Sequence, residues 1–466
     1  MTTSCEFDIR ECTAGRAGTR LILSNGSERG DYIPCTQVQK QFASPHDGVQ
    51  LLKAYYPSDP KWTNRLKISQ AHPNPAATYA WDHDYDDYWP LDFDVENGSV
   101  ERQLHEIKMI GADVHLTLSL DMSLSDAELV QLFSRLAGYG VVYLRINHEA
   151  NGAWFRHHKL HTRKEISDFF VRCHKLIQCH APNIKTVFSL TADIFVGNQV
   201  NSVVTRKLAC LDQAGLREAL AIADYWSLDK YVTLNWGWPH THPAQSENYF
   251  SGSIDTWWRL IEETYLLMIH CNGGIMKPLF LHEFNSDADV AGEAGQAEAI
   301  TTVYKRILQS DFPWLEGICF YQYCDEGGLG LMKGRNGDYT ATRSLPAYAE
   351  VLKQYVPPMT IADMPWPHAH FAFAWPHPAA IKGMALTLSA PAGQFTNCFN
   401  AAVYLVEKDN WRRLESGETA SVSDVHLQVF MPPRFAGGCL RHVTTVHDVR
   451  TQLAACLRVN HQGTIS

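Results

Sequence analysis

Between about residue 50 and residue 356, short apolar runs alternate with longer segments of helical periodicity. This alternation is typical of βα units, because a parallel strand needs a crossover of a dozen or more residues to return beside its neighbour. Eight candidate strands follow one another: Val49–Tyr55, Arg65–Gln70, Asp113–Leu120, Val141–His148, Lys185–Leu190, Tyr225–Tyr231, Lys277–His282 and Gly317–Tyr323. The first two are separated by too few residues for an ordinary crossover helix. The pattern predicts an α/β fold, a (β/α)8 TIM barrel.

The segments between the later strands have clear helical signals. Arg163 to Gln178 places Ile166, Phe169, Phe170 and Cys173 on one stripe, which should cover the sheet. Ser125 and Glu128 have the spacing of a capping box at the start of another helix. Further helices are expected at Val100–Ile110, Asp255–His270, Glu298–Gln309 and Leu345–Tyr355.

The chain of 466 residues is longer than one barrel requires, so a second domain is expected. After Val356 the pattern changes to short alternating runs, such as Met384–Leu388, Ala401–Leu405 and Val425–Phe430, separated by turn residues. We expect residues 1–48 to form an N-terminal β segment that can pair with the C-terminal domain. Residues 49–356 would then form the barrel, and residues 357–466 an accessory β-sandwich.

Composition excludes some classes of partner. The formal charge of −10 gives no general attraction to nucleic acid or to an anionic membrane. The 13 Trp and 19 Tyr residues could supply aromatic rings against which the apolar faces of sugars stack. The twelve cysteines show no CxxC pair or repeated spacing, so mostly free thiols are expected.

The chain has neither a run of 18 apolar residues nor a basic start followed by an apolar segment. We expect a soluble protein without a visible signal peptide, either cytoplasmic or secreted if a leader has been removed. The oligomeric state is left open.

The segment Val141 to Phe155 reads VVYLRINHEANGAWF. Side chains alternate between the faces of a strand, so Val142, Leu144 and Ile146 would meet the helices. The alternate set would face the barrel axis: Tyr143, Arg145, Asn147 and Glu149. Glu149 would then lie at the carboxyl end of the strand, where barrel enzymes place their active sites.

The segment Lys277 to Asn285, KPLFLHEFN, has the same arrangement and presents Glu283 at its carboxyl end. Strand alternation puts Glu283 on the face of Leu279 and Leu281, where its charge would be costly to bury unless something hydrogen-bonds or uses it. Each Glu alone is also consistent with a salt bridge at the barrel mouth. Together they fit a retaining glycosidase, in which a nucleophile and an acid/base lie about 5–5.5 Å apart.

Such a pair needs two different pKa values. We expect hydrogen-bond donors to hold Glu283 ionised. We expect partial burial and the neighbouring negative charge to raise the pKa of Glu149.

The run Leu144-Arg145-Ile146-Asn147-His148-Glu149-Ala150-Asn151-Gly152, followed by Trp154-Phe155, resembles the acid/base strand of glycoside hydrolase family 26. In that family the strand reads LRPLHEMNG and runs into an aromatic pair. The family belongs to clan A, whose acid/base and nucleophile lie at the ends of strands four and seven. The resemblance covers about residues 95–355 and implies that Glu149 is the proton donor and Glu283 the nucleophile.

The same resemblance implies the substrate-binding side chains. The segment Asp224–Tyr231 is similar to a sixth strand whose terminal Tyr hydrogen-bonds the nucleophile, which would be the role of Tyr231. His148 and Trp154 would line the subsite next to the scissile bond, and Arg145 would support the carboxylates. Trp226 and Tyr321 complete the expected set, although Tyr321 stands where the family has a Trp-containing segment. A further departure is Arg156-His157-His158, which replaces the second aromatic block.

The activity implied is that of an endo-β-glycanase acting by double displacement on a polysaccharide or oligosaccharide, without cofactor or metal. Family members attack β-mannans, β-1,3-xylans or mixed-linkage β-glucans, and this sequence does not select among them. Two other interpretations stay open. The altered aromatic positions would suit a barrel that binds carbohydrate without cleaving it. The histidines His157, His158 and His161 would suit a metal-dependent hydrolase, although their spacing fits no HExxH helix.

Overall fold

The protein is described by a computed structural model that covers residues 19–354 except 28, 43–45, 72–87, 94–98, 111, 193–194, 197–198, 201–214, 238–248, 310–311 and 313. It also describes β1 (Glu6–Phe7) and short strands after residue 369. All statements below concern these residues.

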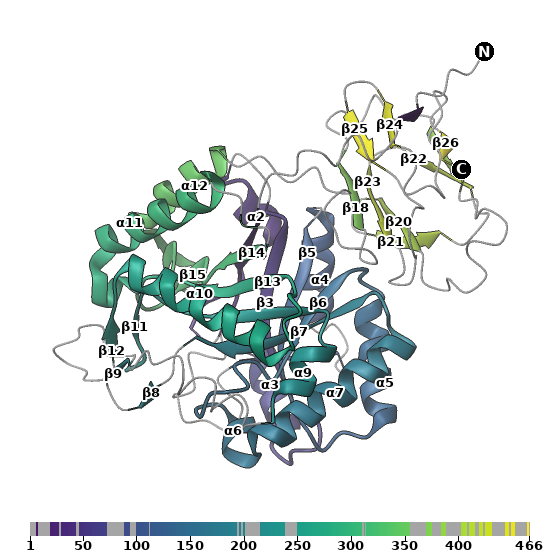
Figure 1. Cartoon of the computed structure of the whole chain (residues 1–466). Coiled ribbons are helices and arrows are strands. Elements are labelled where there is room, and N and C mark those ends of the chain that lie inside the picture. Colours follow the sequence, from purple (N-terminus) through teal and green to yellow (C-terminus); the bar gives the residue numbers. More distant parts are fainter. Residues whose placement is uncertain are drawn as a thin grey trace.

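Eight parallel strands form a closed sheet (Figure 1). In order around the barrel they are β2 (Arg20–Ser24), β3 (Gly48–Tyr55), β5 (Asp113–Leu120), β6 (Val142–Ile146), β7 (Ile184–Thr191), β10 (Tyr225–Asp229), β13 (Leu279–Phe284) and β14 (Leu315–Phe320). Pairing of β2 with both β14 and β3 completes the ring. The short strand β4 (Trp89–Pro90) adds to the end of β3. The predicted (β/α)8 barrel is therefore confirmed.

Helices follow the strands and surround the sheet (Figure 1). They are α2 (Cys35–Gln39), α3 (Trp62–Ala71), α4 (Ser99–Met109), α5 (Asp126–Ala137), α6 (Arg156–Leu160), α7 (Arg163–His180), α9 (Arg217–Ile222), α10 (Ile254–Cys271), α11 (Ala288–Gln309) and α12 (Ser344–Gln354). The predicted stripe of α7 is buried, and the capping box of Ser125 and Glu128 is present. In the described part of the chain, no helix combines the length and apolar character needed to cross a bilayer.

Two strand assignments made from the sequence were wrong. Arg65–Gln70 lies in α3, and the first barrel strand is β2, inside the segment expected to lie apart from the barrel. Residues 20–24 are buried and apolar enough for a barrel strand, but the run is only five residues long and one of its two partners, β14, is almost 300 residues away. The two errors cancel in the strand count, so β6 and β13 are still strands four and seven.

Two short hairpins lie beyond the barrel strands. β11 (Thr233–Asn235) pairs with β12 (Tyr249–Ser251), and β8 (Phe195–Val196) pairs with β9 (Gln199–Val200). A three-stranded sheet follows β14: β15 (Cys324–Asp325), β16 (Met332–Arg335) and β17 (Asp338–Ala341).

The predicted C-terminal β region contains strands: β18 (His370–Ala374), β19 (Met384–Thr387), β20 (Ala402–Glu407), β21 (Asn410–Leu414), β22 (Thr419–Val422), β23 (Val425–Phe430), β24 (Val443–Val446), β25 (Val449–Gln452) and β26 (Thr464–Ile465). They form small sheets, and β1 pairs antiparallel with β24. The β-sandwich and the domain limits remain predictions.

Two kinds of core hold the barrel in shape. The larger lies between strands and helices and includes Leu144, Leu281 and Phe170. A second cluster fills the inside of the barrel with Ile22, Val141, Tyr143, Val187, Tyr225, Phe280 and Cys319. Because these side chains fill the lower interior, a ligand can approach only from the carboxyl ends of the strands.

Candidate active site

Glu149 is placed by a short loop and not, as expected, by the strand itself. β6 ends at Ile146, and Asn147 and Glu149 adopt left-handed backbone conformations with φ of 44° and 54°. Such conformations are unfavourable for residues with a side chain and persist only where neighbours fix them. Asn147 hydrogen-bonds both backbone groups of Leu120, at 2.7 and 3.2 Å, and Ala150 donates its N–H to the Ser189 carbonyl at 2.9 Å. The loop is thus fastened to the ends of both neighbouring strands.

Glu283 faces the barrel interior because of an irregularity in β13. Regular alternation would leave it on the outward face with Leu279 and Leu281, which pack among the helices. The pairing of β13 with β10 shifts register here, so that Leu228 lies opposite Leu281 but Asp229 lies opposite Glu283. A bulge of this kind turns the following side chain to the other face. The expectation that Glu283 shares a face with Leu279 and Leu281 was therefore wrong.

Arg145 joins two carboxylates below the barrel mouth. Its guanidinium donates to both oxygens of Asp229, at 2.5 and 2.6 Å, and to Glu283 Oε1 at 2.6 Å. Its Nε donates to the Thr117 hydroxyl at 2.8 Å, which fixes the plane of the group. Tyr231 donates its hydroxyl to Glu283 Oε2 at 2.9 Å, the contact expected from the sequence. Both oxygens of Glu283 therefore accept hydrogen bonds.

Glu149 has a different environment. Its Oε2 accepts a hydrogen bond from the indole Nε1 of Trp154 at 2.5 Å. Burial raises the pKa of Glu149 well above its usual value, and the negative charges of Asp229 and Glu283 raise it further. The predicted direction of the shift is thus confirmed.

Asp229 is a third carboxylate that the sequence analysis did not select. Burial raises its pKa to about 8, and Glu283 raises it too, while Arg145 opposes the shift. Arg145 binds Asp229 and Glu283, whereas Glu149 accepts from the neutral indole, so a proton shared by the three groups is held best on Glu149. The sequence signal that identified Glu283 was a carboxylate at the end of a buried strand. Asp229 has the same signal, because it ends the buried strand β10.

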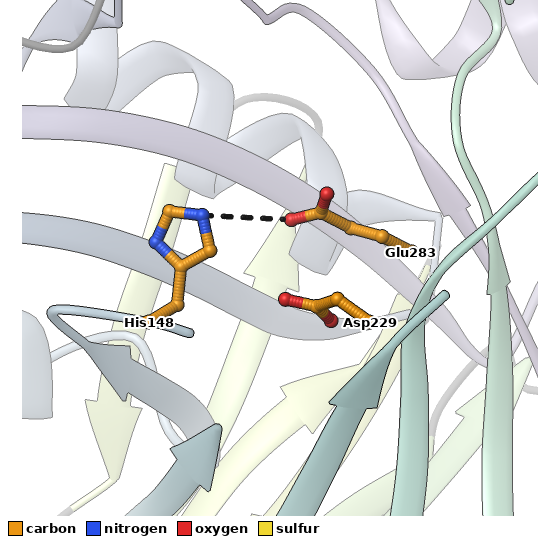
Figure 2. A group of neighbouring side chains, drawn as sticks. All are labelled: His148, Asp229 and Glu283. Atoms are coloured by element: carbon orange, nitrogen blue, oxygen red, sulfur yellow. Dashed lines mark ion pairs between the residues drawn. The ribbon is translucent and has the colours of Figure 1, made fainter. Parts of the chain in front are cut away.

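His148 points its imidazole toward Glu283, and Asp229 lies beside that carboxylate (Figure 2). The Nε2 of His148 is 3.7 Å from Glu283 Oε1 and 3.1 Å from the Tyr88 hydroxyl. Burial lowers the pKa of His148 well below its usual value, and the nearby Arg145 charge adds to this effect. The imidazole is therefore neutral near neutral pH, and the contact with Glu283 is not an ion pair. Tyr88 was not selected from the sequence, although the acidic run before it is compatible with a substrate-binding loop.

Of the remaining predicted substrate-binding residues, Trp154 and Tyr321 lie at the site and Trp226 does not. Trp154 is 38% exposed beside Glu149, and Tyr321 packs its ring edge-on to Tyr231 with centroids 6.0 Å apart. Trp226 is not at the site, which corrects the sequence analysis. It lies on the outward face of β10, fully buried among the helices, and donates its Nε1–H to the Leu220 carbonyl. Alternation along β10 turns Tyr225 and Ser227 inward, so Trp226 must point outward.

His148, Asp229 and Glu283 could also be read as a metal site, because one ligand-type atom from each lies within 4.8 Å of the others. Arg145 already occupies the space between the two carboxylates and supplies a positive charge there. A divalent cation bound by these three groups would have to displace the guanidinium. The cluster is therefore better suited to orienting carboxylates than to holding a metal.

Neither a protein-family profile nor a curated protein matches this sequence. Solved structures do resemble the chain. A family 51 α-L-arabinofuranosidase from Bifidobacterium longum has a TM-score of 0.45 at 12% identity, over 92% of this chain and 100% of that one. A family 39 glycoside hydrolase from Bacteroides cellulosilyticus has a TM-score of 0.41 at 10% identity, covering 89% and 81%. A β-glucosidase from Thermotoga maritima has a TM-score of 0.41 at 12% identity, covering 73% and 98%. Likenesses this weak do not assign a function, which has to come from the site.

Proposed function

We propose that this protein is a retaining glycoside hydrolase that cleaves a polysaccharide by double displacement. The observation that carries the proposal is the pair of unequal carboxyls at strands four and seven. Glu283 accepts hydrogen bonds from Arg145 and Tyr231, while the pKa of Glu149 is raised by burial and by neighbouring charge. A nucleophile must be ionised and an acid must carry a proton, and these environments favour that division.

In the proposed reaction, Glu283 attacks the anomeric carbon while Glu149 protonates the leaving oxygen. Formation of the glycosyl–enzyme bond removes the negative charge of Glu283, which lowers the pKa of Glu149 because one repelling charge is lost. Glu149 can then act as a base toward the water that releases the sugar. Trp154, which holds Glu149 through its indole, keeps an exposed ring beside the acid and could stack on a sugar.

The finer assignment is an endo-β-glycanase related to glycoside hydrolase family 26. It is supported by the hydrogen bonds that Arg145 and Tyr231 donate to Glu283, by His148 beside that carboxylate, and by the hydrogen bond from Trp154 to Glu149. Substrates to compare are β-mannan, β-1,3-xylan and mixed-linkage β-glucan, with released reducing ends as the readout. Retention of a polysaccharide without release of reducing ends would favour a carbohydrate-binding barrel instead.

The central test is Glu283→Ala assayed with an activated aryl glycoside. We expect turnover to be abolished and then restored by azide, because a small anion can occupy the space of the carboxylate and attack the same carbon. The azide product should have the inverted anomeric configuration. Glu298→Ala, at an exposed position of α11, is the matched control and should keep full activity. Undiminished activity of Glu283→Ala would refute the assignment.

The metal-dependent alternative has its own discriminating result. If wild-type activity disappears with a chelator and returns with zinc, and elemental analysis finds bound zinc, the double-displacement proposal fails. Activity that is unchanged by the chelator supports it.

A further inference from the structure

A cavity of about 250 Å³ lies beside the candidate active site, on the carboxyl-terminal face of the barrel. Three segments line it: the loop after β3 from Tyr56 to Pro60, the loop after β5 from Leu120 to Ser123, and α6 with His161. A cavity of about 150 Å³ in a protein can hold a benzene ring, so this one has room for a substituted six-membered sugar ring.

Helix α6 connects this cavity to the catalytic carboxyls. His157 lines the cavity and its Nε2 lies 3.2 Å from the backbone carbonyl of His148, the residue before Glu149. The Phe155 ring lies between the two imidazoles, with centroids 4.4 Å from His148 and 5.5 Å from His157. At the two ends of this segment, Trp154 is 38% exposed beside Glu149 and Leu160 is 59% exposed at the cavity. A polymer could therefore contact both places at once.

The cavity presents hydrogen-bonding groups that suit hydroxyls. His157 is 2% exposed, and within the described residues its Nδ1 has no hydrogen-bond partner. Burial lowers the pKa of His157 well below its usual value, so the ring is neutral. Because Nε2 faces a carbonyl and must donate to it, Nδ1 carries the lone pair but is itself buried. The hydrogen-bonding groups of the cavity that a ligand can reach are the exposed hydroxyls of Ser58 and Ser123 and the carboxylate of Asp121.

The charges of the cavity restrict the ligand further. Asp59 and Asp121 contribute two carboxylates, and Arg156 binds Asp59 at 3.2 Å while lying over the Tyr56 ring. Asp121 would therefore repel a carboxylated or sulfated sugar. Leu160, which is 59% exposed, supplies apolar surface against which the apolar face of a sugar ring can pack.

We propose that this cavity is a distal subsite that binds an uncharged sugar unit of the polysaccharide, remote from the bond that is cleaved. This inference rests on the proposed function and adds to it that the substrate is a neutral polymer held at two places. Two residues of the lining, Arg156 and His157, belong to the Arg156-His157-His158 run where the sequence departs from the family 26 pattern, so the subsite would differ from those of that family.

Filling the cavity tests the proposal. Ser58 and Ser123 are exposed lining residues from two different loops, so Ser58→Trp and Ser123→Trp should fill the cavity without disturbing the core. Ser134→Trp, at an exposed position of α5, is the matched control. The quantity measured is kcat/KM on the polysaccharide divided by kcat/KM on a short activated aryl glycoside. We expect this ratio to fall by about tenfold or more for both cavity variants, which corresponds to the loss of one sugar contact, and to stay constant for Ser134→Trp.

An unchanged ratio in both cavity variants would overturn the subsite, as would faster cleavage of a uronate polymer than of a neutral one. Affinity electrophoresis separates this inference from the proposed function. If the wild type cleaves nothing but is retarded by a neutral polysaccharide, and the cavity variants are not retarded, the subsite stands and the hydrolase proposal fails. If the wild type neither cleaves nor is retarded by any polysaccharide, both are refuted.

Discussion

At the residue scale, the central feature is that the guanidinium of Arg145 binds two of the three buried carboxyls of the candidate site, those of Asp229 and Glu283 but not that of Glu149. Arg145 neutralises Asp229 and Glu283 through short hydrogen bonds, and Glu149 lies outside its reach with a neutral donor. A buried carboxyl without a cationic partner is most easily accommodated in its protonated form. In the proposed reaction, this asymmetric placement of the arginine is what lets one glutamate act as an acid and the other as a nucleophile.

This arrangement predicts a pH-dependent stability that depends on Glu149. A carboxyl with a raised pKa in the folded state binds more protons there than in the unfolded chain, so stability falls as pH rises between its usual pKa of 4.5 and the folded value. Glu149→Gln removes this contribution. We expect the variant and the wild type to differ little near pH 4, and the variant to be more stable by about 1–3 kcal/mol at alkaline pH.

Urea titrations at a series of pH values would measure this difference. Asp229, whose pKa is also raised, is present in both proteins, and because its charge interacts with that of Glu149, the difference measures Glu149 together with this interaction. Any residual activity of the same variant should no longer decline at alkaline pH, because that decline in the wild type reports loss of the proton from the catalytic acid. Parallel stability curves for the two proteins would contradict the predicted state of Glu149.

At the element scale, two local departures from regular structure bring the carboxyls together. β6 stops before Glu149 and a loop with left-handed residues carries it, while a register shift in β13 turns Glu283 inward. Regular strands would have placed Glu283 among the helices. The helices, in contrast, follow their sequence signals closely, and both α5 and α7 begin with the reciprocal hydrogen bonds of a capping box.

The cap of α5 supplies a test of the helix layer. Ser125 accepts a hydrogen bond from the Glu128 N–H, which would otherwise lack an intrahelical partner. Ser125→Ala should lower the free energy of unfolding by about 1 kcal/mol. Ser134→Ala, at an exposed interior position of the same helix, should leave stability unchanged or raise it slightly because Ala is the better helix former. Equal effects of the two substitutions in urea unfolding would show that the cap contributes nothing.

At the scale of the whole molecule, closure of the barrel depends on five residues near the N-terminus. β2 fills the position between β14 and β3, and Ile22 belongs to the cluster inside the barrel. Without it, β3 and β14 would both be open edges with unpaired backbone groups, which favour aggregation.

Deletion of residues 1–24 should therefore prevent soluble folding, whereas deletion of residues 1–5, which reaches neither β1 nor β2, should not. Circular dichroism and size-exclusion chromatography of the two truncated proteins would show the difference. A soluble 25–466 fragment with a cooperative unfolding transition would mean that the barrel does not require β2.

The sequence by itself determined the barrel class, seven of its eight strands, the helix layer and the two glutamates selected as candidates, because burial and helix periodicity are local and repeat along the chain. The position of the eighth strand and the assembly of the site were decided by pairing and contacts between residues far apart in the sequence. The position of β2 depends on β14, far away in sequence, and the inward turn of Glu283 depends on its register with β10. Asp229 and Tyr88 became recognisable only through their contacts with Arg145 and His148. Hydrogen-bond register and side-chain proximity are properties of the closed sheet, so no local pattern could specify them.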